Sequence, residues 1–110
     1  MRGALCARVV GGLLGTSRQT PHDRVRVGTM LGVLDRGALR FPAWQFDPEG
    51  ENGVVSGLPE VLGALRLSPF GKAYWLSRPN PYLAERSTVE ALREGELEAV
   101  KSLAESVGAV

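Results

Sequence analysis

The chain has 110 residues, of which 44% are hydrophobic and 23% charged, and its formal net charge of +1 is divided unevenly, with +4 in residues 1–47 and −3 in residues 48–110. This length suits one ordinary core or two very small ones and excludes a large multidomain enzyme. With a single cysteine, Cys6, and a single histidine, His22, an internal disulfide is impossible and a metal centre has little support, so we expect no metal and no cofactor.

A first helix is expected at residues 4–14. Its apolar positions recur at helical spacing and would bury one stripe, made of Leu5, Val9 and Leu13. Gly15 fits the end of this helix, because glycine adopts the left-handed backbone conformation without a Cβ clash. Ser17 is a typical N-cap for a second helix. The pattern therefore predicts a helix, a three-residue turn and another helix.

The second helix, expected at residues 18–27, carries a basic stripe. At about 100° per residue, four polar side chains fall on one arc, namely Arg18, Gln19, His22 and Arg26. Pro21 and Val25 fall beside this arc and would face the first helix. Such an arc suits the major groove of DNA, since Arg pairs with guanine and Gln with adenine while other basic side chains hold phosphates. The alternative interpretation is a solvated cationic helix.

A β-hairpin is predicted after the second helix. Two short apolar runs, residues 31–34 and 38–41, flank a turn at residues 35–37 that contains a glycine. A hairpin in this place is the wing of a winged helix, from which Arg36 and Arg40 would contact phosphates. The residues predicted to contact DNA are Ser17, Arg18, Gln19, His22, Arg24, Arg26, Arg36 and Arg40.

The segment through Phe46 resembles the small winged helix-turn-helix domains of excisionase-like and MerR-like DNA-binding proteins. The resemblance rests on GTSRQ, on the Arg-spaced helix and on LGVLDRGALRFP. It implies a DNA-binding domain at residues 1–47. Three aromatic residues at the end of this domain, Phe41, Trp44 and Phe46, are expected to pack as a hydrophobic seam. Residues 49–57 are rich in glycine and predict an exposed loop, so we place a linker at residues 48–57.

The second half is predicted to be a series of short helices. Pro59 and Pro69 suit the first positions of two of them. Ser87 and Glu90 form a capping-box pattern at the start of another. A last amphipathic helix would bury one face, made of Leu97, Val100, Leu103, Ala104 and Val107. The expected fold is mainly α with one short β-hairpin, that is, a winged helix-turn-helix followed by a small helical domain at residues 58–110.

Several runs of this second half occur in a familiar order. AYWL at residues 73–76 is followed by PNPYL at 79–83, by RSTVEAL at 86–92, and by Gly95 before a terminal helix. In this order they resemble the toxin-binding domain of Xre/MbcA/ParS-type antitoxins. The chain departs from that family's pattern at Ala84-Glu85, where the family has two glycines, and at Thr88, where it has a proline.

The resemblance implies an antitoxin of a type II toxin-antitoxin pair, itself no enzyme, that neutralises a RES-domain toxin acting on nicotinamide adenine dinucleotide. In this family the C-terminal region covers or enters the toxin's active-site cleft, and the N-terminal domain binds the operon's own promoter as an oligomer. The expected partners are therefore the toxin, promoter DNA and a second copy of the chain. The implied toxin-binding residues are Trp75, Asn80, Tyr82, Leu83, Arg86, Val107, Gly108, Ala109 and Val110.

Two other classes of protein compete with this interpretation. One is a stand-alone DNA-binding transcription regulator or excisionase-like factor whose second half mediates oligomerisation. The other is a small enzyme, which is disfavoured because the sequence has no P-loop, no clustered metal ligands and no recognisable pairing of a nucleophile with a base. No apolar segment is long enough to cross a membrane, and the low cysteine content fits a reducing compartment, so we expect a cytoplasmic protein.

Overall fold

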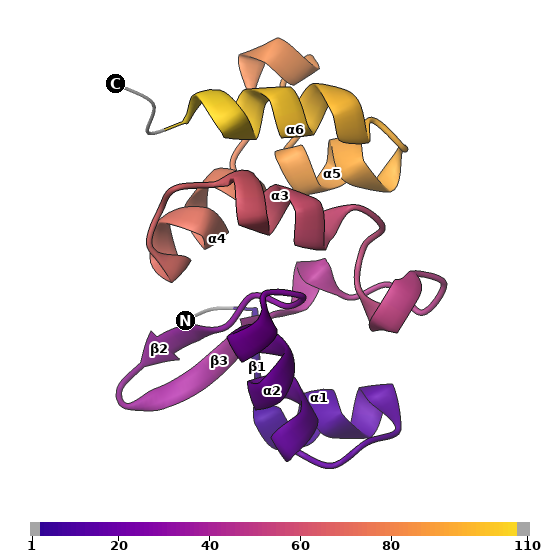
Figure 1. Cartoon of the computed structure of the whole chain (residues 1–110), viewed down its shortest axis with the longest axis vertical. Helices are drawn as coiled ribbons and strands as arrows, with labels where there is room; N and C mark the ends of the chain where they lie inside the picture. Colours follow the sequence, from indigo (N-terminus) through magenta and orange to yellow (C-terminus); the bar gives the residue numbers. More distant parts are fainter. Residues whose placement is uncertain (1–2, 108–110) are drawn as a thin grey trace.

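The structure is a computed structural model that describes residues 3–107. The elements in this range are β1 (Ala4–Cys6), α1 (Ala7–Leu14), α2 (Gln19–Val27), β2 (Val33–Asp35), β3 (Ala38–Pro42), η1 (Ala43–Gln45), η2 (Glu51–Gly53), α3 (Leu58–Ala64), α4 (Pro69–Ser77), η3 (Pro81–Leu83), α5 (Thr88–Arg93) and α6 (Leu97–Ser106). The predicted fold class, mainly α with a short hairpin, is confirmed. As Figure 1 shows, α1, α2 and the hairpin lie at one end of the molecule, α5 and α6 lie at the other, and α3 and α4 lie between them.

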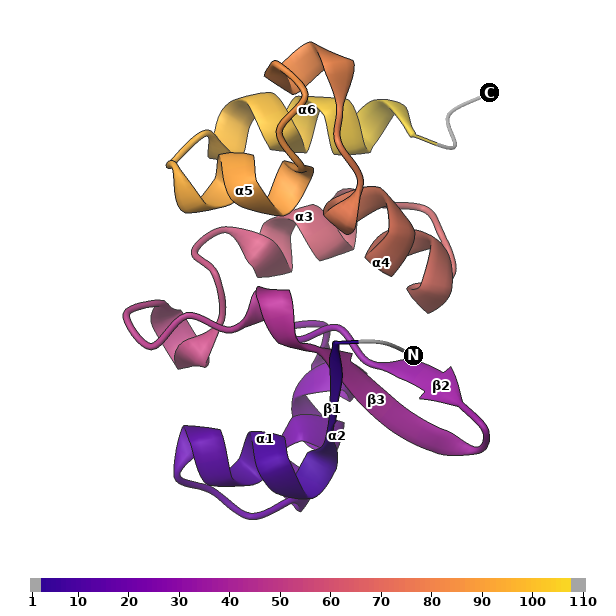
Figure 2. The same cartoon turned by 180° about the vertical axis from the view of Figure 1, so that it is seen from behind.

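The first turn of the predicted first helix is a strand instead. Residues Ala4–Cys6 pair antiparallel with β3, with Leu5 opposite Phe41, and α1 begins only at Ala7 (Figure 2). The prediction at this point was wrong because strand pairing gives these residues backbone hydrogen-bond partners from β3, which the local sequence pattern does not reveal.

The buried face of α1 also differs from the prediction. Val10 and Gly11 are buried, whereas Val9 and Leu13 are 42% and 64% exposed. The reason is a close approach to the following turn, since a Cβ atom at Gly11 would lie 2.7 Å from the carbonyl oxygen of Ser17. The only side that can sit this near the turn is the one bearing glycine, so this face of α1 turns inward.

The turn between α1 and α2 consists of residues 15–18 and is one residue longer than predicted. Gly15 ends α1 in the left-handed conformation with φ 70°, as predicted. The residue directly before α2 is Arg18, which has helical φ and ψ of −68° and −12° and makes no side-chain capping hydrogen bond. Ser17 still serves the helix start, since its hydroxyl accepts a hydrogen bond from the backbone N–H of Gln19 at 3.3 Å.

The predicted hairpin is confirmed, with its first strand two residues later than expected. The turn consists of Arg36 and Gly37, which have φ of 54° and 81°, and Asp35 pairs with Ala38 across it. Positive φ at both central residues is the hallmark of the type I′ turn that two-residue hairpins favour. In the sheet, β3 is the central strand between β1 and β2.

The segment that follows the hairpin is part of the core. The predicted aromatic seam is confirmed, since Phe41 is fully buried and both Trp44 and Phe46 pack against the core. The exposed loop expected at residues 49–57 was wrong for Val54 and Val55, which are buried. Their burial has a physical cause, because a bridge between Phe46 and Val54 folds this segment back on itself and turns both valines inward.

The helices of the second half begin with the predicted caps. The Ser68 hydroxyl accepts from the backbone N–H of Gly71, and Ser87 with Glu90 forms a complete capping box. Helix α6 buries Val100 and Ala104 as expected. The buried residues of both halves form one cluster, which extends from Val10 in α1 to Ala104 in α6. Among the described helices, none is long and apolar enough to cross a membrane.

Candidate nucleic-acid interface

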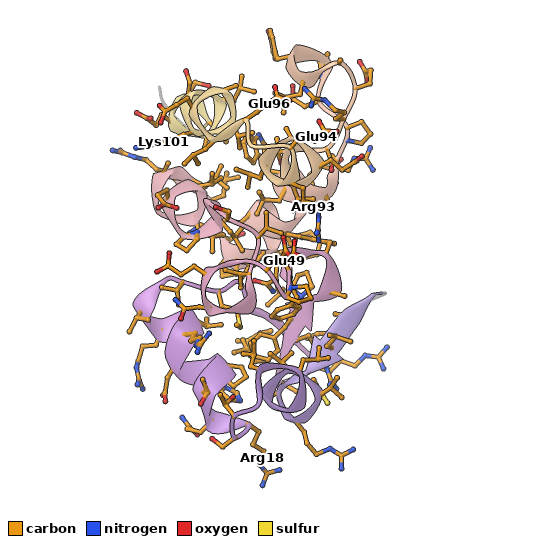
Figure 3. The ribbon with its side chains drawn as sticks, turned by 90° about the vertical axis from the view of Figure 1, so that its right-hand side faces the viewer. Arg18, Glu49, Arg93, Glu94, Glu96 and Lys101 are labelled. Carbon is orange, nitrogen blue, oxygen red and sulfur yellow. The ribbon has the colours of Figure 1, made fainter. Side chains whose placement is uncertain are left out.

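The predicted basic stripe lies on the outer surface of α2. Arg18, Gln19, His22 and Arg26 are all exposed. Pro21 is buried, whereas Val25 is half-buried and its side chain lies beside Gly32, just before β2. Figure 3 shows Arg18 at the extreme end of the molecule, pointing away from it, with Glu94 and Glu96 near the opposite end. The stripe is therefore free to meet a large partner.

An open groove joins this stripe to the hairpin. It has a volume of about 640 Å³ and is lined by Cys6, Ala7, Arg8, Arg18, His22, Gly37, Ala38, Leu39 and Arg40. The groove brings Arg18 from the turn before α2, His22 from α2 and Arg40 from β3 to one surface. The ring of His22 is placed by an edge contact with Phe41, at 6.1 Å between ring centroids.

Arg8 belongs to this groove although it was absent from the predicted site. Its position depends on β1, which places the start of α1 beside β3. No local signal in the sequence marks Arg8, because its nearness to Arg40 comes from a strand pairing between segments far apart in the chain. Together with Arg18 it makes the groove a cationic surface.

The thiol of Cys6 also lines this groove. The pKa of Cys6 is lowered, mainly by the backbone N–H of Val9 in the first turn of α1, and further by the charges of Arg8 and Arg40. Each of these groups stabilises negative charge at this place. The groove is thus suited to an anion such as a phosphate.

Five of the predicted DNA-contacting residues lie outside the groove lining, namely Ser17, Gln19, Arg24, Arg26 and Arg36. The guanidinium of Arg24 donates to the backbone carbonyl of Asn52 at 2.6 Å, which ties the back of α2 to η2. Arg36 is exposed at the tip of the hairpin, and Ser17 is exposed in the turn before α2. The structure therefore gives Arg24 an internal partner and leaves Arg36 and Ser17 open to solvent.

Asp23 is a further residue of the α2 surface that the sequence analysis missed. Its Oδ1 accepts a hydrogen bond from Gln19 Nε2 at 3.2 Å and another from Arg26 Nη2 at 2.8 Å. The spacing of these residues along the helix would have revealed this contact, because positions three and four apart face each other on a helix.

The predicted toxin-binding residues lie mostly in internal contacts. Leu83 is buried, and the side chain of Asn80 caps η3 by accepting from the backbone N–H of Tyr82 at 2.9 Å. Trp75 and Val107 are half-buried and pack against the core. Tyr82 differs, because it is 81% exposed. The predicted residues Gly108, Ala109 and Val110 lie outside the described residues.

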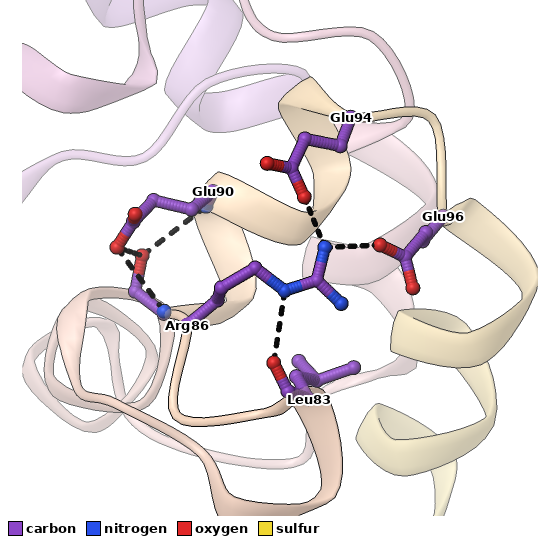
Figure 4. A network of polar contacts seen from close by, with 6 residues as sticks. Leu83, Arg86, Glu90, Glu94 and Glu96 are labelled. Atoms are coloured by element: carbon purple, nitrogen blue, oxygen red, sulfur yellow. Dashed lines mark hydrogen bonds and ion pairs between the residues drawn. The ribbon is translucent and has the colours of Figure 1, made fainter.

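Arg86 is the centre of a polar network in the second half (Figure 4). Its guanidinium forms ion pairs with Glu94 and Glu96, and its Nε donates to the carbonyl of Leu83 at 2.9 Å. These bonds raise the pKa of Arg86 and lower the pKa of Glu96. Arg86 thus links η3 to the start of α6, which is a structural task inside the chain.

No family model matches the sequence, and no curated protein matches it. A similar solved structure is the NMR structure of Rv2175c, with a TM-score of 0.78 and 23% sequence identity over 94% of this chain and 79% of that chain. At this level of identity the similarity shows a shared fold alone.

Proposed function

We propose that this protein is a DNA-binding transcription regulator, in which α2 enters the major groove and the β2–β3 hairpin lies along the DNA backbone. The observation that carries the proposal is the exposed polar stripe of α2 beside a groove that holds Arg8 and Arg40. An α-helix with side chains is roughly 10–12 Å wide and the major groove is about 12 Å wide, so α2 has the size that this site requires.

The division of contacts follows from chemistry. Gln19 and Arg26 can pair with base edges, since an amide matches adenine and a guanidinium matches guanine. Arg8, Arg18 and Arg40 surround the groove and are suited to phosphates, which fix the register of a protein on DNA without reading its sequence. A second copy of the chain would then place two such helices on symmetric half-sites.

The test is the salt dependence of binding to a short labelled duplex of mixed sequence. Each phosphate contact contributes roughly −0.9 to the slope of log K against log salt, so Arg8→Ala and Arg18→Ala, which remove proposed phosphate contacts, should each weaken binding and reduce the slope by up to about 1. Arg66→Ala is the matched control, because Arg66 is an exposed arginine between α3 and α4. The proposal fails if the Arg8 and Arg18 variants behave like this control.

A second candidate function is that of an antitoxin, which binds a RES-domain toxin through its second half and represses its own operon through α2. Three exposed aromatic side chains of this half favour a protein partner, namely Phe70, Tyr74 and Tyr82. Aromatic residues of this kind are enriched at the energetic centres of protein interfaces. Tyr82 also lies within the PNPYL run on which the resemblance to antitoxins rests.

Co-expression with a RES-domain toxin tests this candidate. An antitoxin should restore growth and form a complex that survives purification, and Tyr82→Ala should weaken both effects while leaving the thermal stability of the free protein unchanged. Absence of rescue and of a complex would leave the lone regulator as the better proposal.

A further inference from the structure

We propose that Asp23 is a specificity-determining residue of the α2 surface, which orients Gln19 and Arg26 for base reading and weakens binding to DNA of unrelated sequence. This inference rests on the proposed DNA-binding function. It goes beyond that function because it gives a negatively charged residue a task on a surface that otherwise attracts phosphates.

The geometry places Asp23 between the two candidate base-reading side chains. It follows Gln19 by four residues and precedes Arg26 by three, so all three lie on one face of α2. A single oxygen, Oδ1, accepts from Gln19 Nε2 at 3.2 Å and from Arg26 Nη2 at 2.8 Å. The side chains of Arg26 and Asp23 are 74% and 46% exposed, so this cluster is accessible from outside.

These hydrogen bonds leave the groups that read bases available. A carboxylate only accepts, so the amide of Gln19 must turn its NH₂ group toward Asp23, which keeps its carbonyl oxygen and its second N–H for an adenine. Arg26 uses part of one donor edge and retains further N–H groups for a guanine. Asp23 thus restricts the orientation of both side chains without occupying their pairing groups.

The negative charge of Asp23 has a separate effect on affinity. Binding of DNA without regard to sequence is dominated by attraction between basic side chains and phosphates, and a carboxylate on the same face opposes it. At the preferred sequence this repulsion is offset, because the carboxylate can also accept from the amino group of a cytosine. Removing Asp23 should therefore strengthen binding to DNA of unrelated sequence and reduce the preference of the protein for its selected sequence.

The experiment begins with selection from a pool of randomised duplexes by the full chain, which yields a preferred duplex and its scrambled counterpart. Affinities for both are then measured for the wild type, Asp23→Ala, Asp23→Asn and Glu98→Ala. The last is a charge-matched control, because Glu98 is an exposed carboxylate on α6, at the other end of the molecule. Far-ultraviolet circular dichroism verifies that each variant keeps its helical content.

We expect Asp23→Ala to bind the scrambled duplex more tightly than the wild type does, while the ratio of the two affinities falls roughly tenfold, which is the usual effect of losing about one base contact. Asp23→Asn can still accept from Gln19 and Arg26 but lacks the charge, so it should keep more of this ratio than Asp23→Ala. Glu98→Ala should leave the ratio unchanged.

The outcomes separate the inference from the function on which it rests. If the wild type selects a sequence and Asp23→Ala retains the wild-type ratio, the role of Asp23 is wrong and the DNA-binding proposal stands. If the wild type binds duplexes but selects no sequence, the inference is overturned as well. If the wild type binds no duplex at all, the proposed function itself fails.

Discussion

Gln45→Met tests how the β2–β3 hairpin is held against the rest of the molecule. Gln45 is fully buried at the end of η1, where its Oε1 accepts from the backbone N–H of Leu31 at 2.7 Å and its Nε2 donates to the carbonyls of Leu31 and Pro42 at 2.8 and 3.1 Å. These bonds join the strand that ends at Pro42 to the segment between α2 and β2. Methionine fills nearly the same volume but makes none of them.

The expected loss follows from the three backbone groups that would remain buried without their partner. An unsatisfied buried group costs about 1–3 kcal/mol, and carbonyls suffer less than N–H groups, so the free energy of unfolding should fall by about 3–5 kcal/mol. This is a large part of the roughly 5–15 kcal/mol that stabilises a typical domain. Because the volume is conserved, a cavity contributes little to this figure.

Urea unfolding followed by tryptophan fluorescence measures this effect, since Trp44 and Trp75 both pack against the core. The midpoint should fall by roughly 2 M with an unchanged slope. Gln19→Met is the matched control, because Gln19 is exposed, and it should change stability by no more than about 0.5 kcal/mol. A loss of less than about 1 kcal/mol for Gln45→Met would refute the reasoning, because it would mean that water replaces the amide at this site.

Two further predictions concern α1 and the Arg86 network. Gly11→Ala should lower stability by about 1–3 kcal/mol, because its Cβ would lie 2.7 Å from the carbonyl oxygen of Ser17, whereas Gly12→Ala, with nothing within 4 Å, should raise it by about 0.5–1 kcal/mol; thermal unfolding of the two variants decides this. The pKa of Glu96 is lowered in the folded state by Arg86, so the stability that this pair supplies is present above the ordinary value of 4.5 and is lost as the pH falls through the lowered pKa. Arg86→Ala should therefore reduce the urea midpoint near neutral pH and change it much less in strong acid, and a difference that is equal at both pH values would contradict this.

The features that the sequence predicted correctly are those set by neighbouring residues. Gly15 ends α1, the turn at Arg36 and Gly37 closes the hairpin, and the capping box of Ser87 and Glu90 starts α5. In each case the deciding interaction spans at most four residues, so a short stretch of sequence contains all the residues that take part in it.

The features that it missed depend on contacts between distant segments. The strand β1 forms because β3 lies beside it, and Arg8 reaches the groove only as a consequence. The internal role of Arg86 follows from its bonds to the Leu83 carbonyl and to Glu96, ten residues away, which a pattern of residue types does not encode. Asp23 is a different case, since its spacing of four residues from Gln19 and three from Arg26 can be read from the sequence.

The single cluster of buried side chains has a consequence for how the molecule opens. The cluster includes Val10, Val54, Val55 and Ala104, so it joins the two ends of the molecule. When this core is disrupted, both ends should unfold together. Amide hydrogens in α1 and in α6 should then exchange with solvent water through the same global event, at matching rates in denaturant. A proteolytic cut between the ends would therefore expose apolar surface on both fragments instead of releasing an independently folded N-terminal domain.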